Sequence, residues 1–381
     1  MITADMALDV YIDINILLVF ACVLWLAATA GLRAAGLGHA VSARLSLLRW
    51  GFLAVLASPV IGAVLGKGIA FGFTLSDFIV AQYLQGRFQM DPFTLETMLT
   101  LRGQTTRAML DPQGSVAGVL GLVLLGGALF HAARLFLAWA ILRRVMRESY
   151  LWRRFGAVEL RLSDTVSVPF STRSWHRRYV VLPSAMLARA DDLRIALGHE
   201  FQHLRQGDVE WEIGLALLRP LLFWNPAFHL WKRQIEEMRE LACDRRLMAR
   251  RKLGVAAYCQ CLLRVCHDSL TPRHLFAVTM PVVGLLTAAP RPSPRRRFAP
   301  RSAGLLRRRM EALVEARSEP RSTRLSLMLL APLGILTFTA AVALQRPGDW
   351  SQDRLMLSAI LNLERFEALN ATVPDLAVPG W

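Results

Sequence analysis

Long apolar runs dominate the pattern of hydrophobic and polar positions along this chain of 381 residues. A helix needs about 20 mostly apolar residues to cross the hydrocarbon of a bilayer, and four runs are that long. They lie at residues 9–32, 46–72, 115–142 and 325–344. The last run contains no charged residue, and the first contains only Asp9 and Asp13. With 54% hydrophobic residues and a mean hydropathy of +0.35, the chain is predicted to be a polytopic membrane protein with four transmembrane helices.

Basic residues are concentrated between the third and fourth apolar runs. Of the 45 Lys and Arg residues, 34 lie at 143–324, against 17 of the 29 Asp and Glu residues. Arg33, Arg44 and Arg49 flank the short loop between the first two runs. By the positive-inside rule, both regions face the cytoplasm. We therefore expect both termini and the 73–114 loop to lie outside, with a cytoplasmic domain between helices three and four.

The net charge of +16 could also indicate nucleic-acid binding, but the chain has no nucleic-acid-binding motif. Basic residues near an anionic bilayer surface each gain about 1 kcal/mol of binding free energy, so we expect the lipid bilayer as the partner and no direct nucleic-acid binding.

Four of the five cysteines fall in the cytoplasmic block and should be reduced. Cys259, Cys261 and Cys266 lack the spacing of a zinc knuckle, and we interpret them as packing residues.

The pattern divides the chain into four parts. We expect a three-span membrane region, a globular cytoplasmic domain, a fourth transmembrane helix and a short extracytoplasmic tail. Their bounds are 1–142, 143–324, 325–344 and 345–381. A basic, proline-rich stretch at 289–302 should be a linker without regular structure.

Within the cytoplasmic block, strand-like and helix-like patterns follow one another, so the expected fold is an α+β domain in a mainly α membrane protein. Residues 158–162 and 179–182 are typical of strands, and 191–206 and 233–251 of helices. The apolar stretch 213–231 is interrupted by Pro220, Asn225 and Pro226. We interpret it as a buried or membrane-apposed hairpin rather than a span. A span would place the helices at 191–206 and 233–251 on opposite sides of the membrane, although both carry the candidate ligands of one metal ion that are described next.

The helix at 191–206 carries the strongest chemical signal, the pattern His-Glu-x-x-His. His199 and His203 are one helical turn apart on the same face, so both can bind one zinc ion. Glu200 follows directly and is the candidate general base, which removes a proton from a water on the metal. The alternative is a solvated helix that carries two surface histidines.

A second acidic motif, Glu240-Leu241-Ala242-Cys243-Asp244, lies on the next predicted helix. Glu240 is the candidate third ligand, since a catalytic zinc ion commonly has three protein ligands. Asp244, one turn further along, and Asp208 could each hold the outer ring nitrogen of a ligand histidine. Each could instead be an ordinary helix carboxylate. The group that stabilises the oxyanion stays open among His229, Tyr258 and several arginines.

These motifs together resemble the BlaR/MecR-type membrane zinc metallopeptidases, a gluzincin-like group of peptidase family M56. The resemblance rests on His199-Glu200-x-x-His203 with Asp208, on Phe223-Trp224-Asn225-Pro226 and on Glu240-x-x-x-Asp244, and it covers about 1–345. It implies one Zn²⁺ per chain on His199, His203 and Glu240, with Glu200 as the catalytic base. It also implies a multi-pass protein of the bacterial inner membrane that cleaves a cytoplasmic repressor or other regulator after an outside signal.

The sequence departs from the antibiotic-sensing members after the fourth span. Only residues 345–381 follow, and the chain has no S-x-x-K and no K-T-G motif. β-Lactam acylation is therefore not the expected signal. Two other functions stay open: an HtpX-like membrane quality-control protease, and a non-proteolytic transducer whose zinc domain binds a partner. The sequence also leaves a homodimer open.

A protease of this kind can bind an extended substrate by adding it to an exposed sheet edge. Tyr179, Val180, Val181 and Leu182 precede the metal helix and form the candidate edge strand. The alternative is that they form an internal strand of the sheet.

Overall fold

The structure is a computed structural model in which most of the helical and strand-forming chain is described. The described residues are 4–34, 41–65, 75–85, 87, 91–110, 116–251, 254–270, 283–284, 300–315 and scattered helical positions between 328 and 363. The chain divides into two compact units. The first comprises 1–24, 50–123 and 329–381, and the second comprises 25–49 and 124–328.

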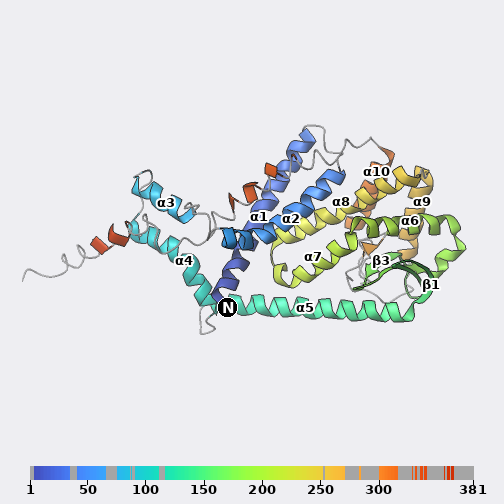
Figure 1. Ribbon diagram of the computed structural model, residues 1–381, viewed down its shortest axis with the longest axis horizontal. Helices are drawn as coiled ribbons and strands as arrows, with labels where there is room; N and C mark the ends of the chain where they lie inside the picture. Colours follow the sequence, from blue (N-terminus) through green and yellow to red (C-terminus); the bar gives the residue numbers. More distant parts are fainter. Residues whose placement is uncertain are drawn as a thin grey trace, which may run out of the picture. The chain divides into compact units, whose positions relative to one another are not determined.

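Three of the described helices are long and apolar enough to cross a membrane (Figure 1). They are α1 (Ala4–Ala34), α2 (Val41–Leu65) and α5 (Val116–Glu148). They correspond to the first three predicted spans, which confirms these runs as helices of membrane-spanning length. The fourth predicted span, 325–344, lies largely outside the described residues, as does the tail at 345–381.

The predicted outer loop 73–114 contains two further helices. These are α3 (Leu75–Leu84) and α4 (Pro92–Leu110). Asp91 caps the start of α4, because its carboxylate accepts a hydrogen bond from the backbone N–H of Thr94 at 3.1 Å. Val80 of α3 and Leu95 of α4 are both buried in one small apolar cluster. The loop is therefore a helical pair with a core of its own.

The second unit contains a five-stranded sheet in the order β1-β2-β4-β3-β5. The strands are β1 (Tyr150–Phe155), β2 (Val158–Ser163), β3 (Phe170–Arg173), β4 (Arg178–Pro183) and β5 (Val283–Gly284). β2 and β4 run parallel, and the other neighbouring strands run antiparallel. The strands expected at 158–162 and 179–182 are thus confirmed as β2 and β4, while β1 and β3 were not predicted.

Alternating side chains give the sheet two different faces. Val180 and Leu182 of β4 point to one face, where they pack against Leu204 of α6 (Ala190–Gln206) and Val209 of α7 (Asp208–Leu222). Val181, between them, points to the opposite face and packs against Val145 near the end of α5. Figure 1 shows α6 on one side of the strands and α5 on the other. The sheet therefore separates α6 from the end of α5.

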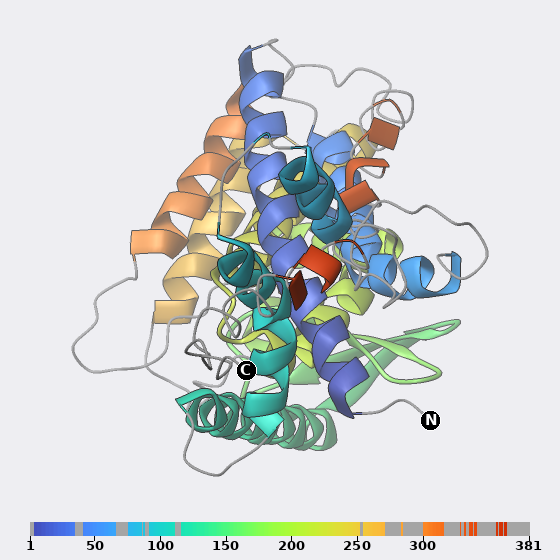
Figure 2. The same cartoon turned by 90° about the vertical axis from the view of Figure 1, so that its left-hand side faces the viewer.

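Helices α6 to α10 complete this unit. They include α8 (Pro226–Arg251), α9 (Val255–Leu270) and α10 (Pro300–Val314), and η1 (Ser184–Ala188) links β4 to α6. Figure 2 shows α9 and α10 running side by side. Cys259, Cys261 and Cys266 lie in the apolar core between these helices, as expected of packing residues.

Two further expectations can be compared with the structure. The apolar stretch at 213–231 is a helical hairpin, formed by α7 and the start of α8 with the bend at 223–225, as predicted. The expectation that the whole of 289–302 lacks regular structure was wrong at its end, because α10 begins at Pro300. Proline is tolerated there, since the first residue of a helix needs no N–H donor.

Candidate metal centre

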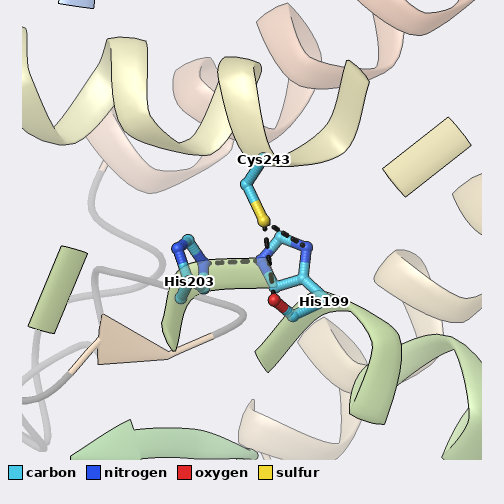
Figure 3. A group of neighbouring side chains, drawn as sticks. All are labelled: His199, His203 and Cys243. Atoms are coloured by element: carbon cyan, nitrogen blue, oxygen red, sulfur yellow. Dashed lines mark hydrogen bonds between the residues drawn. The ribbon is translucent and has the colours of Figure 1, made fainter. Parts of the chain in front are cut away.

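The two histidines of the His-Glu-x-x-His pattern face each other from one side of α6 (Figure 3). Both are fully buried, and the Nε2 atoms of His199 and His203 lie 2.9 Å apart. Residues four apart on a helix lie one turn above each other, so the helix alone brings the two rings together. Two buried nitrogens at this distance are suited to share a cation.

The carboxylate of Glu240, from α8, completes a group of three. Its oxygens lie 3.5 Å from His199 Nε2 and 3.8 Å from His203 Nε2. Zinc binds nitrogen and oxygen at about 2.0–2.2 Å, and a tetrahedral site then separates its donors by about 3.3–3.6 Å. Both Glu240 oxygens are buried without a hydrogen-bond partner among the described residues, as expected of a metal ligand. The 3.5 Å separation lies in this range, whereas the 2.9 Å between the two Nε2 atoms is shorter and the 3.8 Å is longer, so shifts of a few tenths of an ångström would give the three donors the spacing of a zinc site.

The electrostatics of Glu240 and His199 agree with this role. Burial acts to raise the pKa of Glu240, but the charges of His203, Arg309 and Arg239 outweigh it and hold the pKa well below its ordinary value. Burial, helped by the neighbouring His203, lowers the pKa of His199. An ionised carboxylate and a neutral imidazole are the forms that bind a metal.

Cys243, one turn along α8 from Glu240 and also buried, is a second candidate ligand that the sequence analysis did not single out (Figure 3). Its Sγ lies 3.6 Å from His199 Nδ1, on the opposite edge of the ring from Nε2, and 3.5 Å from the carbonyl oxygen of His199. Burial, with the charge of Asp244, raises the pKa of the thiol well above its ordinary value. Glu240 therefore fits the metal better than Cys243, because it faces both Nε2 atoms.

A carboxylate orients the ring of His203. Asp208 Oδ2 lies 2.6 Å from His203 Nδ1, which directs Nε2 toward Glu240. Gly207 ends α6 in the left-handed conformation (φ +68°), and its N–H bonds the carbonyl of His203. This reversal brings Asp208 back alongside the helix that it follows, at a position where a side chain would strain the backbone. Asp208 in turn forms an ion pair with Arg49 of α2.

His199 is oriented through Tyr258 of α9. The Tyr258 hydroxyl lies 2.9 Å from His199 Nδ1 and donates to Asp244 Oδ1 at 2.6 Å. Because that hydroxyl proton goes to Asp244, the Tyr258 oxygen accepts from His199 Nδ1–H, and His199 Nε2 keeps its lone pair for the metal. Asp244 also lies 3.4 Å from His199 Nδ1 itself.

Arg309 of α10 holds Asp244 with two hydrogen bonds, Nε to Oδ2 and Nη2 to Oδ1, both 2.7 Å long. Its Nη1 lies 3.2 Å from Glu240 Oε2. Arg309 is 1% exposed, so this interaction is buried away from solvent. Sequence analysis missed Arg309, although Leu306, Met310 and Leu313 place it on the apolar side of α10. An arginine within an apolar helical stripe was the available signal.

Glu200 is fully buried on α6, and neither of its oxygens has a hydrogen-bond partner among the described residues. Burial raises its pKa to about 7, although the charge of His203 and an interaction with Ser171 of β3 act in the opposite direction. A carboxylate poised near neutral pH suits a general base. His203 and Glu240 of the metal centre and Ser171 of β3 are thus among the groups that act on the Glu200 carboxylate.

The candidates for the edge strand and for the oxyanion partner need correction. Tyr179 to Leu182 are not an edge strand, because β4 pairs with β2 on one side and with β3 on the other. β3 is nearer the edge, and among the described residues it pairs on its outer side with the two residues of β5. Tyr258 bonds Asp244, and the imidazole of the exposed His229 binds the carbonyl of Phe223 at 2.6 Å. Neither is placed as an oxyanion donor.

Comparison with known proteins gives one match. The family model described as BlaR1 peptidase M56 matches residues 104–283, which include α6, the strands and α8. No curated protein that was compared matches the chain.

Proposed function

We propose that this chain, a member of the BlaR1-type peptidase family M56, is an integral-membrane zinc metalloendopeptidase. Its family and its three helices of membrane-spanning length make it a membrane-associated metallopeptidase. The proposal adds the metal, the residues and the class of substrate. One observation carries it: His199, His203 and Glu240 converge, and the buried carboxylate of Glu200 lies close enough to feel the charges of His203 and Glu240.

The residues of the chain would divide the work as follows. A zinc ion on His199, His203 and Glu240 supplies Lewis acidity toward a peptide carbonyl and toward a water. Glu200, with a pKa near 7, takes the proton of the attacking water and returns it to the leaving amine. Asp208 and Tyr258 keep the two imidazoles in the tautomer that leaves Nε2 for the metal.

We further propose that the substrate is a cytoplasmic regulator, such as a transcriptional repressor, and that cleavage answers an outside or membrane signal. Support comes from the family and from the basic charge of the 143–324 block, which favours a cytoplasmic location. The base Glu200 is present beside the ligands, which favours a protease over a transducer that only binds partners.

Substitution of the base tests the proposal directly. Glu200→Gln should retain zinc, because the ligands are intact, and should lose cleavage of peptide substrates to a few per cent of wild type or less. Metal content and peptide cleavage by the purified full chain measure the two effects. In cells, Glu200→Gln should accumulate the substrate, and identification of the trapped proteins would separate one or two regulators from many damaged membrane proteins. Wild-type rates in Glu200→Gln would contradict the proposal.

A further inference from the structure

A cavity of about 850 Å³ is lined by the end of α5, by α7 and by strands β2, β4 and β3 of the sheet. Thr172 and Arg173 of β3 line it, as do Arg143 and Arg147 from the end of α5 and Glu210 from α7. It lies in the second unit, and the metal ligands and Glu200 do not line it. The cavity is therefore separate from the metal centre, and the proposed metal chemistry gives it no role.

β3 connects this cavity to the metal centre. Ser171 of β3 interacts with Glu200, and the next two residues along the strand, Thr172 and Arg173, line the cavity. A strand rises about 3.3 Å per residue, so the cavity begins within about 7 Å of the position beside the base. Side chains alternate along a strand, so Thr172 points to the face opposite Ser171. A substrate residue paired with Thr172 would direct its side chain to that face, where Arg143 and Arg147 line the cavity.

β5 shows how an extended segment pairs with this edge. It runs antiparallel to β3, with Val283 opposite Ser171 and Gly284 opposite Phe170. A substrate in the same position and direction would place the residues that precede its scissile bond beside Thr172 and Arg173. The cavity would therefore receive side chains on the N-terminal side of the cleaved bond.

The charge of the cavity determines which side chains fit. Arg173 is already paired with Glu210 at 2.6 Å, and Arg161 donates to the carbonyl of Ser149 at 2.6 Å. Arg143 and Arg147 are exposed, one turn apart on α5, and form no ion pair with any residue that the structure describes. Their two guanidiniums are the unneutralised charge of the cavity.

Aromatic groups complete its walls. The Arg143 guanidinium stacks over the ring of Trp139 at 4.2 Å, and Trp175, just beyond β3, is 86% exposed. Stacking holds the planar guanidinium of Arg143 flat against the Trp139 ring, and its N–H groups at the edge can still donate hydrogen bonds. An acidic side chain is the complement of this arrangement, since guanidiniums bind carboxylates through paired N–H donors.

We propose that this cavity is a specificity subsite that binds an acidic side chain of the extended protein substrate, N-terminal to the scissile bond, through Arg143 and Arg147. The proposal rests on the proposed function, because it assigns a substrate preference to that metal centre. It requires the substrate to take the place of β5 beside β3, in the direction that β5 shows.

The test is a digest of a position-scanning peptide library by the purified full chain. Wild type should enrich Asp and Glu N-terminal to the cleaved bond. For a matched pair of peptides with Glu or Gln at the enriched position, the Glu peptide should have a KM about tenfold lower with a similar kcat. Arg143→Gln/Arg147→Gln should abolish this difference, and Arg143→Glu/Arg147→Glu should shift the preference to Lys and Arg. Arg144→Gln is the control, because Arg144 pairs with Glu148 and does not line the cavity.

An unchanged preference in both double variants, or no acidic preference in wild type, would overturn the subsite while leaving a peptidase. If wild type cleaves no better than Glu200→Gln, the proposed function fails instead. Binding of the same Glu and Gln peptides to the Glu200→Gln protein then still decides the subsite. The anionic headgroup of a lipid is the competing ligand. If the double variants lose co-purified phosphatidylglycerol but keep the wild-type peptide preference, the cavity is a lipid site and the proposal is wrong.

Discussion

Replacement of Arg309 by methionine should destabilise the second unit more than any surface substitution on α10. The guanidinium makes two 2.7 Å bonds to Asp244 and lies 3.2 Å from Glu240, with all three groups buried. Removing it leaves two carboxylates in the interior without this cation. Loss of one partner of a buried ion pair costs about 3–5 kcal/mol. A domain is stable by only about 5–15 kcal/mol, so the loss is a large fraction of the total.

Thermal unfolding of the purified full chain in detergent, followed by circular dichroism, measures this cost. For a domain of this size, each kcal/mol corresponds to about 2–4 °C, so Arg309→Met should lower the melting temperature by about 6–20 °C. The matched control is Arg307→Met. Arg307 belongs to the same helix, but its side chain is 81% exposed and pairs with Glu311 on the surface. Its loss should change the melting temperature by no more than about 2 °C.

A second substitution separates the charge effect from lost packing. Asp244→Asn in the Arg309→Met background removes the buried charge that has lost its two hydrogen bonds, so the double variant should recover part of the lost stability. Two independent substitutions would instead add their costs. A melting temperature for Arg309→Met within about 2 °C of wild type would refute the reasoning, as would simple additivity in the double variant.

Three further predictions concern other parts of the chain. Asp208→Asn should weaken zinc binding by about 10- to 100-fold in a chelator competition, because the His203 ring loses the carboxylate that orients it. The hydrogen bond and charge of Arg264 lower the pKa of Asp192 in the folded state. The ion pair therefore stabilises the folded protein fully above the ordinary aspartate pKa of about 4, and this stabilisation is lost as the pH falls through the folded-state pKa. Asp192→Asn should therefore flatten the melting temperature between pH 7 and about pH 3, and an unchanged acid dependence would count against this pair. For topology, a cysteine at Gln104 should react with a membrane-impermeant thiol reagent in intact cells, and one at the exposed Trp175 only after lysis, against a background of five buried native cysteines.

The parts of the site that follow local periodicity could be predicted from the sequence. His199 and His203 are four residues apart in a helix, and their meeting follows from helical geometry alone. Glu240 and Asp244 follow the same rule on α8, and the structure brings Glu240 to the Nε2 atoms and Asp244 to Tyr258. Asp208 was expected to hold a ligand histidine, and the left-handed turn at Gly207 brings it to His203.

The order of the strands could not be predicted, because it depends on pairing between distant segments. Tyr179 to Leu182 have the apolar character of a strand, but the same character suits an edge or an interior position. The neighbouring Phe170-Ser171-Thr172-Arg173 has a weak strand pattern, so the sequence did not predict β3 and left both positions open for β4. Of the two interpretations, an edge strand or an internal strand, the structure shows the internal one.

The arginines that hold the orienting carboxylates were also missed, for a different reason. Arg309 stands in the run Arg307-Arg308-Arg309, where composition indicates a solvated or membrane-facing surface. Only the position of the helix against α8 shows that the third arginine points inward. Arg49 similarly belongs to a short basic loop in the sequence, and its pairing with Asp208 spans 159 residues.

The account depends most directly on the identity of the third metal ligand, and zinc content decides it. Wild type, Cys243→Ala and Glu240→Ala are purified as full chains, and zinc per chain is measured by elemental mass spectrometry after removal of loosely bound metal. We predict about one zinc per chain in wild type and in Cys243→Ala, and loss of most of it in Glu240→Ala, because Glu240 faces both Nε2 atoms whereas Cys243 lies at His199 Nδ1. Retention of zinc in Glu240→Ala together with its loss in Cys243→Ala would contradict the account.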